Sequence, residues 1–311
     1  MSKKTQGELI LLLTAILYGA SFSAQRIGMQ HMGPFAWNTL RFFIGALVLL
    51  PVVYFTGRPA RIKSGSDSSA GDGYPAADTH QDKKTLIKGG AACGIALFAA
   101  ATLQQVGIVY TTAAKSGFIT ALYMVMVPIL AVFIGKKARP LIWLCIVIAA
   151  AGLYLLTMKN GFVMKTGDFL TLLCALGYAV HLLIIDHFSP RVDGVRMSCI
   201  QFFVCGILSI PFTVFAEHGI DLAAVSQCVL PLLYNGVITC GVAFTLQIIG
   251  QQKTEPAVAS LILCLESVFS AVFGALLLHE MLSGRELLGC GIMFTAILLA
   301  QLPEKRGRRQ Q

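Results

Sequence analysis

The chain has 311 residues, of which 56% are hydrophobic and 13% are charged, and its formal net charge is +9. Soluble globular domains carry about 25% charged residues, so this composition excludes an ordinary soluble protein and indicates an integral membrane protein. The excess of Lys and Arg is expected to mark the orientation in the membrane, and nucleic-acid binding is not predicted.

The first apolar segment, residues 8–28, follows two lysines and has the general pattern of a signal peptide. Its apolar part can cross about 30 Å of hydrocarbon and many similar segments follow, so an uncleaved transmembrane helix is favoured. We predict an all-α integral membrane protein with ten transmembrane helices. The predicted spans are residues 8–28, 35–55, 87–109, 115–135, 139–157, 168–187, 196–216, 229–249, 257–278 and 285–302.

One long polar interval, residues 57–84, separates the second span from the third. It is rich in Gly, Ser and Asp and has almost nothing to bury, so we predict a mobile loop. With ten alternating spans, 18 of the 24 Lys and Arg residues fall on the side of this loop and both termini. Five fall on the opposite side, and Arg41 lies within a span. The positive-inside rule therefore predicts a cytoplasmic loop and cytoplasmic termini.

The two halves of the chain are similar to each other in a register that changes once. At an offset of 160 residues, Tyr18 aligns with Tyr178; beyond the polar interval the offset is 143, and Gln104 aligns with Gln247. Five spans per half is an odd number, so the second half must enter the membrane upside down relative to the first.

This arrangement predicts two inverted five-helix repeats as the domains of the protein. The first is residues 8–157, including the loop 57–84, and the second is residues 168–302. Inverted repeats supply two related shapes of one bundle, open to opposite sides, with a shared site near the midplane. The pattern therefore predicts transport by alternating access.

Three stretches resemble the EamA-type members of the drug/metabolite transporter superfamily. They are YGASFSAQRIGMQHMGPFAWNTLRFFIGALVLLP, KSGFITALYMVMVPILAVFIG and ASLILCLESVFSAVFGALLLHEMLSGRELLGCGI. The resemblance covers nearly the whole chain in two EamA-like halves. It implies ten helices, an inverted repeat and movement of small metabolites across a bacterial inner membrane, often outward.

Two short family motifs fall on named positions of this sequence. Residues 18–22 match the aromatic-Gly-x-Ser-Phe stretch of the family, and Arg41 begins its Arg-Phe element. The proline that usually follows the position of Glu266 is Ser267 here. This departure leaves the resemblance intact but makes the transfer of a substrate from the family unsafe.

Two charged side chains, Arg41 and Glu266, lie well away from the ends of predicted spans. Arg41 lies about seven residues into its span, about 10 Å below the outer surface. It is either a structural anchor for carbonyl or acidic groups or a contact for an anionic substrate group. Glu266 lies near the middle of the ninth span, where an unpaired carboxylate is costly. It is a candidate for proton coupling or for binding a substrate amine, and the alternative is a neutral, hydrogen-bonded structural role.

Other polar side chains within the spans are further candidates for lining a substrate site. Each can also be an ordinary interhelical hydrogen-bonding or packing residue, which is the favoured role for His181. Pro128 removes one backbone hydrogen bond from the fourth span, so it predicts a kink suited to gating. The remaining candidates are Tyr18, Tyr123, Tyr178, Tyr234 and Asn235.

The sequence contains no H-E-x-x-H, no G-x-x-x-x-G-K-[ST] and no G-x-S-x-G motif, and its nine cysteines form no C-x-x-C pair. No metal site and no cofactor are therefore predicted. We predict a secondary transporter in the bacterial inner membrane, and export of amino-acid-like, amine or drug-like metabolites with protons as a candidate coupling ion. The alternatives are an intramembrane or lipid-modifying enzyme that uses His181 and Glu266, and a nontransporting scaffold. Monomer and homodimer are not distinguished.

Overall fold

The computed structural model describes residues 3–56, 83–110, 113–136, 140–157, 165–278 and 283–300. Every regular element in these ranges is a helix, which confirms the all-α prediction. The predicted loop 57–84 lies outside the described residues except for its last two, which begin the third helix.

The helices are numbered in chain order. The first half forms α1 (Lys3–Gly28), α2 (Pro34–Thr56), α3 (Lys83–Tyr110), α4 (Ala113–Ala121), α5 (Tyr123–Phe133) and α6 (Pro140–Thr157). The second half forms α7 (Thr166–Phe188), η1 (Ser189–Arg191), α8 (Gly194–Ala216), α9 (Leu222–Gln227), α10 (Val229–Leu233), η2 (Tyr234–Phe244), α11 (Thr245–Gln251), α12 (Pro256–Leu263), α13 (Glu266–Leu278) and α14 (Gly284–Ala300).

Seven helical stretches in the described part of the chain are long and apolar enough to cross a membrane. They are Lys4–Gly28, Pro34–Phe55, Lys83–Tyr110, Thr166–Arg191, Gly194–Ala216, Val229–Gln251 and Pro256–Phe273. Two shorter apolar helices cover Ile119–Phe133 and Pro140–Leu155. The chain is therefore a multi-pass membrane protein, and the predicted count of ten spans goes beyond the seven that length and hydropathy establish.

Two of the predicted spans are broken near their middle. Leu122 separates α4 from α5, and its N–H donates to the carbonyl of Ile119 (3.2 Å). In the second half, the N–H of Leu265 donates to the carbonyl of Ile262 (3.2 Å) between α12 and α13. Both bonds connect residues three apart, as in a 3₁₀ turn. Helix α5 continues through Pro128, so the break precedes the proline at which a kink was predicted.

The predicted span 229–249 also differs from a regular α-helix. Residues Tyr234–Phe244 form a π-helix, a rare conformation that is common at functional sites. Gly236 lies where this stretch meets α2: a Cβ there would be 2.5 Å from Cγ2 of Ile44, so only glycine permits the close approach.

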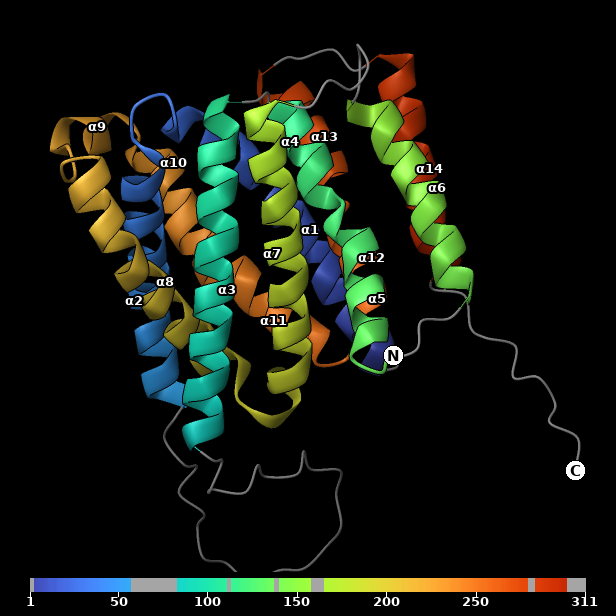
Figure 1. Ribbon diagram of the computed structural model, residues 1–311, viewed down its shortest axis with the longest axis horizontal. Helices are drawn as coiled ribbons and strands as arrows, with labels where there is room; N and C mark the ends of the chain where they lie inside the picture. The colour runs from blue at the N-terminus through green and yellow to red at the C-terminus, as the bar shows by residue number, and fades with distance from the viewer. Residues whose placement is uncertain are drawn as a thin grey trace, which may run out of the picture.

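The helices stand side by side as one bundle, in which α2 packs against α8 and α6 pairs with α14 (Figure 1). Helix α3 packs against both α7 and α8. Its Gly94 permits the contact with α8, because a Cβ there would lie 2.7 Å from the Cβ of Val204. At the end of α8, the carboxylate of Glu217 accepts the backbone N–H groups of Phe35 (2.9 Å) and Ala36 (2.7 Å), which caps α2.

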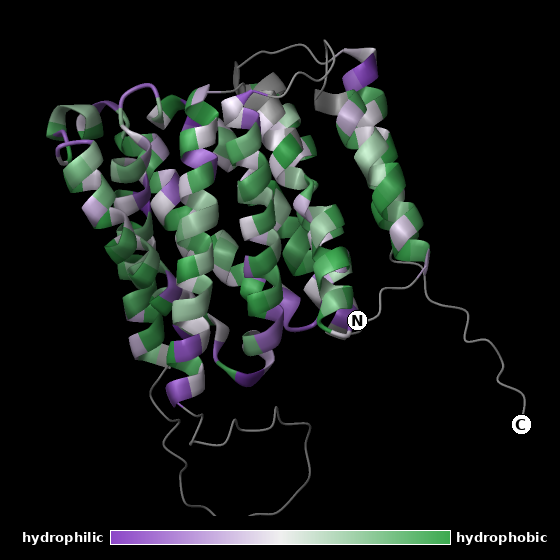
Figure 2. Ribbon diagram, in the orientation of Figure 1, coloured by the Kyte–Doolittle hydropathy of each residue, from purple (hydrophilic) through white to green (hydrophobic). Residues whose placement is uncertain are grey.

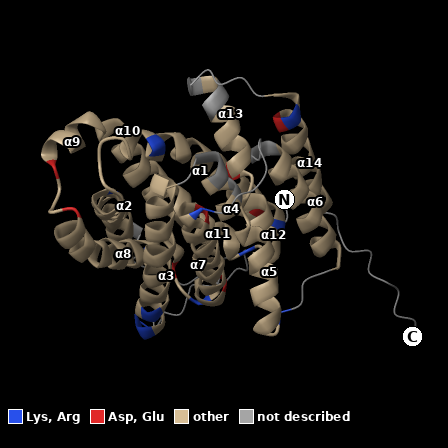
Figure 3. Ribbon diagram, turned by 45° about the horizontal axis from the view of Figure 1, so that its top comes forward, with Lys and Arg blue, Asp and Glu red and all other residues tan. Residues whose placement is uncertain are grey.

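The surface of the bundle is apolar and several polar side chains point inward. Large hydrophobic residues are widely exposed, among them Phe133 (83%) and Phe215 (82%), whereas Arg41, Gln104 and Gln247 are buried. Most of the helical ribbon carries the green of hydrophobic residues (Figure 2). Charged residues gather mainly near the ends of helices (Figure 3). This distribution is expected when the solvent of the surface is lipid.

Candidate functional site

A small cavity lined by both polar and apolar side chains lies between the two halves of the bundle. Its volume is about 50 Å³, room for roughly four ordered waters. Side chains from both halves line it. They are Tyr18, Ser21, Phe22, Gln25, Arg41, Gln104, Thr120, Tyr123, Tyr178, Leu182, Thr239, Phe244, Gln247, Leu263 and Glu266.

Helix α1 supplies one complete face of this cavity. Tyr18, Ser21, Phe22 and Gln25 recur at helical spacing, so their side chains lie on the same side of α1. Gly19 sits on the face toward α13, where a Cβ would be only 2.4 Å from the Cβ of Phe269. This close approach brings α13 against the helix that carries Tyr18.

Two hydrogen bonds join tyrosines of one half to glutamines of the other. The hydroxyl of Tyr18 donates to Oε1 of Gln247 (2.7 Å), and the hydroxyl of Tyr178 donates to Oε1 of Gln104 (3.0 Å). All four side chains line the cavity. The two tyrosines are equivalent in the repeat alignment, and so are the two glutamines, which means that the second bond is the counterpart of the first.

The two helix breaks place a further pair of residues in the cavity. Tyr123 begins α5 directly after Leu122, and Glu266 begins α13 directly after Leu265. The hydroxyl of Tyr123 donates to Oε1 of Glu266 (3.3 Å). Glu266 is 8% exposed and lies in the first turn of α13, where the positive end of the helix dipole favours a carboxylate.

Arg41 is the cation of this cavity. Its side chain is 3% exposed, and its guanidinium carbon lies 4.6 Å from the centre of the Phe42 ring. Its Nε atom is buried without a hydrogen-bond partner, and no carboxylate in the described ranges lies within ion-pair distance of it. Arg41 and Glu266 line the cavity together with Tyr18 and Tyr178.

Five of the eight predicted substrate-site residues line the cavity, and three do not. His181 shares a hydrogen bond with Oε1 of Gln201 (3.0 Å) and lies outside the lining. Tyr234 donates to the backbone carbonyl of Leu17 (3.1 Å), as an interhelical contact. Asn235 stands behind the lining and accepts a hydrogen bond from Ser21 (2.8 Å). The pairing of His181 with Glu266 that an enzyme would need is therefore not formed.

The sequence analysis missed most of the neutral lining residues. Gln104 and Gln247 could have been found, because the repeat alignment places glutamine at both positions inside predicted spans. Ser21 and Gln25 follow Tyr18 at helical spacing, which is also a usable signal. Leu182 and Leu263 carry no such signal, since apolar residues in a span give no indication of which ones face a cavity.

A chain of hydrogen bonds borders the cavity toward the C-terminal end of α3, which lies at the top of Figure 1. The side-chain amide of Gln105 donates to Gln25, the amide of Gln25 donates to Ser21 (3.0 Å), and Ser21 donates to Asn235. The amide of Asn235 donates to the carbonyl of Pro231 (3.2 Å). These bonds connect α3, α1 and the segment formed by α10 and η2.

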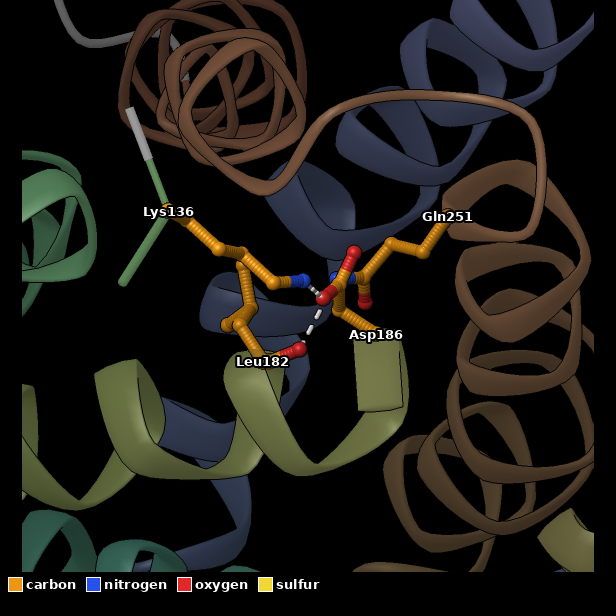
Figure 4. A network of polar contacts seen from close by, with 4 residues as sticks. All are labelled: Lys136, Leu182, Asp186 and Gln251. Atoms are coloured by element: carbon orange, nitrogen blue, oxygen red, sulfur yellow. Dashed lines mark hydrogen bonds and ion pairs between the residues drawn. The ribbon is translucent and has the colours of Figure 1, made fainter. Parts of the chain in front are cut away.

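A second chain borders the cavity on the opposite side. The amide of Gln247 donates to Oε1 of Gln251 (3.2 Å), whose own amide donates to the backbone carbonyl of Leu182 (3.2 Å). One turn beyond Leu182 on α7, Asp186 forms an ion pair with Lys136 (Figure 4). The pair joins the end of α5 to α7.

A groove of about 500 Å³ lies on the far side of this second chain. Lys136, Asp186 and Gln251 line it, together with Lys253 and Glu255 from the connection between α11 and α12. Partial burial lowers the pKa of the Lys136 ammonium below its ordinary value. Among the described residues, no group of three His, Cys, Asp or Glu side chains is placed to hold a metal ion.

Comparison with known proteins gives a consistent result. The profile of the EamA-like transporter family matches residues 5–158 and again residues 165–302. An uncharacterized transporter of Archaeoglobus fulgidus is 31% identical over 303 residues, covering 96% of this chain and 87% of the relative. The uncharacterized transporter YoaV of Bacillus subtilis is 20% identical, covering 94% and 97%. A protein of known crystal structure has a similar fold, with a TM-score of 0.74, 17% identity and 96% of each chain covered.

Proposed function

The chain belongs to the EamA-like transporter family, and we propose that it is a secondary transporter that moves small organic metabolites by alternating access. It is a membrane transporter and not an enzyme, which removes the enzyme alternative. The substrates that we propose are amino-acid-like, amine or drug-like compounds, and the proposed direction is export.

The observation that carries this proposal is the pair of equivalent hydrogen bonds across the cavity. Tyr18 reaches from the first half to Gln247, and Tyr178 reaches from the second half to Gln104. A cavity on a pseudo-twofold axis has this property: each half offers the same group to the other. Exchange of roles between the halves would then open the cavity to opposite sides in turn.

Helix packing supports the same relation. Helix α3 packs on α7 and α8, while its counterpart, the segment from α10 to α11, packs on α1 and α2. Equivalent helices run in opposite directions in Figure 1, as α1 with α7 and α2 with α8. The breaks at Leu122 and Leu265 are also equivalent at the offset of 143. We therefore propose two inverted repeats of five spans each, residues 8–157 and 168–302.

The two hydrogen-bonded chains bordering the cavity are the proposed gates. The upper gate is Gln105, Gln25, Ser21 and Asn235; the lower gate is Gln247, Gln251 and the carbonyl of Leu182, backed by the Lys136–Asp186 ion pair. With both formed, the cavity is flanked by closed polar layers on each side. Opening one while the other stays closed constitutes alternating access.

The lower gate is proposed to face the cytoplasm. Helix α1 begins and α14 ends on the lower side of Figure 1, the side to which the positive-inside rule assigns both termini. A bacterial inner membrane is the location we propose. Glu266 is the proposed coupling residue, because a proton and a cationic substrate group compete for one carboxylate and exchange in opposite directions follows from that competition.

Reconstituted vesicles test this function. The purified chain is placed in sealed liposomes with labelled amino acids, amines, nucleosides and dyes, with and without a pH gradient. We expect substrate movement that the gradient accelerates, and no acceleration in Glu266→Gln. The matched control is Glu255→Gln, which removes an exposed carboxylate of the groove and leaves the cavity unchanged. Absence of protein-dependent flux for every compound would contradict the proposal.

A further inference from the structure

The cavity is lined by one cation, Arg41, which no carboxylate of the described ranges neutralises. Arg41 is almost completely buried, and its guanidinium carbon lies 4.6 Å from the centre of the Phe42 ring. An arginine in this position is costly in lipid unless an anionic or carbonyl group pairs with it. Because its Nε is unpartnered and it has no ion pair within the described ranges, the guanidinium retains its hydrogen-bonding capacity for a ligand.

The same cavity contains one acidic group, and it too lacks a full partner. Glu266 is 8% exposed and accepts a single hydrogen bond in the described structure, from Tyr123 at 3.3 Å. A carboxylate can accept about four hydrogen bonds, so most of its capacity is unused. Arg41 and Glu266 are more than an ion-pair distance apart, and both line the cavity with Tyr18 and Tyr178.

The two charged groups come from different halves and have neutral counterparts. Gln201 stands at the position equivalent to Arg41, and Tyr123 at the position equivalent to Glu266. The repeated framework alone would therefore give an uncharged cavity. The first half adds a positive charge and the second half adds a negative charge. The two charges lie at different places in the cavity and sum to zero.

We infer that the cavity binds a compact zwitterion, whose anionic group pairs with Arg41 and whose protonated amine pairs with Glu266. The inference rests on the proposed transport function and names its substrate class. A ligand with only an amine would leave the charge of the buried guanidinium unpaired. A ligand with only an acid would leave the charge of the glutamate unpaired. Phe22, Phe244 and the two tyrosines also line the cavity, and their rings suit an apolar body.

Three sets of compounds with matched carbon skeletons test the inference. Each set contains a zwitterion, its decarboxylated amine and its deaminated acid: alanine with ethylamine and propionate, leucine with isoamylamine and 4-methylpentanoate, and phenylalanine with phenethylamine and 3-phenylpropionate. Affinity is measured from the rise in Tm of the detergent-purified full chain, and flux is measured in liposomes. In at least one set, we expect the zwitterion to bind about 30-fold or more tightly than its amine and its acid.

Variants assign the preference to the two charges. We expect Arg41→Gln, which installs the residue of the equivalent position, to abolish the preference over the amine. Glu266→Gln should abolish the preference over the acid. Arg41→Lys should keep part of the preference over the amine, and Glu255→Gln should change neither preference. Monodisperse elution and a cooperative thermal unfolding transition without ligand show that each variant is folded.

The outcomes separate the inference from the transport function. Zwitterion binding without flux would contradict transport and leave the inference standing. Flux of an amine or an acid at the same affinity as its zwitterion would contradict the inference and leave transport standing. The inference is also overturned if no compound binds, or if Arg41→Gln keeps the preference.

Discussion

Positions 41 and 201 occupy equivalent places in the two halves, and the protein uses them in opposite ways. In the second half, Gln201 shares a hydrogen bond of 3.0 Å with His181, and both side chains are fully buried outside the cavity. In the first half, Arg41 faces the cavity, and Ser21, the counterpart of His181, lines it as well. At this pair of equivalent positions, the second half pairs Gln201 with His181, whereas the first half places Arg41 on the cavity.

The difference shows how a duplicated framework acquires a specific site. Phe42 and Phe202, which are also equivalent, stack on each other at 6.0 Å, so the neighbouring positions keep their symmetric packing. Arg41 and Gln201, immediately before them in the chain, differ in charge. The phenylalanines that stack between the two halves therefore follow the repeat, whereas the arginine that is proposed to bind substrate departs from it.

The largest effect that we expect comes from Arg41→Gln, which makes the two positions alike. Gradient-driven uptake should fall about 30-fold or more, because a charge-assisted contact to the substrate is lost. The Tm should stay the same or rise, since a buried charge without a protein partner is removed. The initial rate of uptake and thermal unfolding in detergent measure the two quantities. A fall in Tm with full uptake per folded molecule would assign Arg41 to a structural anchor.

The opposite result is expected at the equivalent position. Gln201→Leu leaves a buried nitrogen of His181 without its partner, which costs about 1–3 kcal/mol of stability. The Tm should fall, and uptake per folded molecule should be unchanged. The double variant with His181→Leu should recover most of the loss, because both polar groups are then absent. Loss of uptake in a well-folded Gln201→Leu protein would show that this position also serves the substrate.

Much of the fold could be predicted from the sequence because lipid imposes a simple rule. Backbone groups must pair within each span, so long apolar segments predict helices. The breaks at Leu122 and Leu265 could not be predicted this way, since neither position carries glycine or proline. Their tight turns depend on how α4, α5, α12 and α13 pack in the bundle. The sequence likewise gives no signal for the π-helical stretch Tyr234–Phe244.

The site was predictable in part for a related reason. Tyr18, Arg41, Tyr123, Tyr178 and Glu266 line the cavity as expected, because polar residues are rare in spans and most of them face inward. A polar side chain that faces the interior of the bundle does not necessarily line the cavity. Tyr234 pairs between helices, whereas Tyr18, Tyr123 and Tyr178 line the cavity, so residue type alone does not separate the two roles. Only the packing of neighbouring helices separates them.

A smaller, symmetric effect is expected for the two cross-cavity tyrosines. Tyr18→Phe and Tyr178→Phe each remove one hydrogen bond to a glutamine, at a net cost of about 0.5–1.5 kcal/mol. If the halves are related by a pseudo-twofold axis, the two losses should agree within a few tenths of a kcal/mol. Thermal unfolding of both variants gives the comparison. A large difference between them would break the proposed equivalence of the halves at the cavity.

The smallest effect is expected at the Lys136–Asp186 ion pair of the lower gate. Its side chains are 44% and 12% exposed, and such pairs contribute about 0.2–1 kcal/mol, so Lys136→Ala should favour the open gate by about 1.4- to 5-fold. Burial lowers the pKa of Lys136. As the pH rises, the ammonium should therefore lose its proton, and the ion pair should break, at a lower pH than for an exposed lysine. Labelling of Leu182→Cys by an impermeant maleimide measures opening. Lys136→Arg, which stays charged, should remove the alkaline increase; an equal increase in both proteins would exclude the ion pair as its cause.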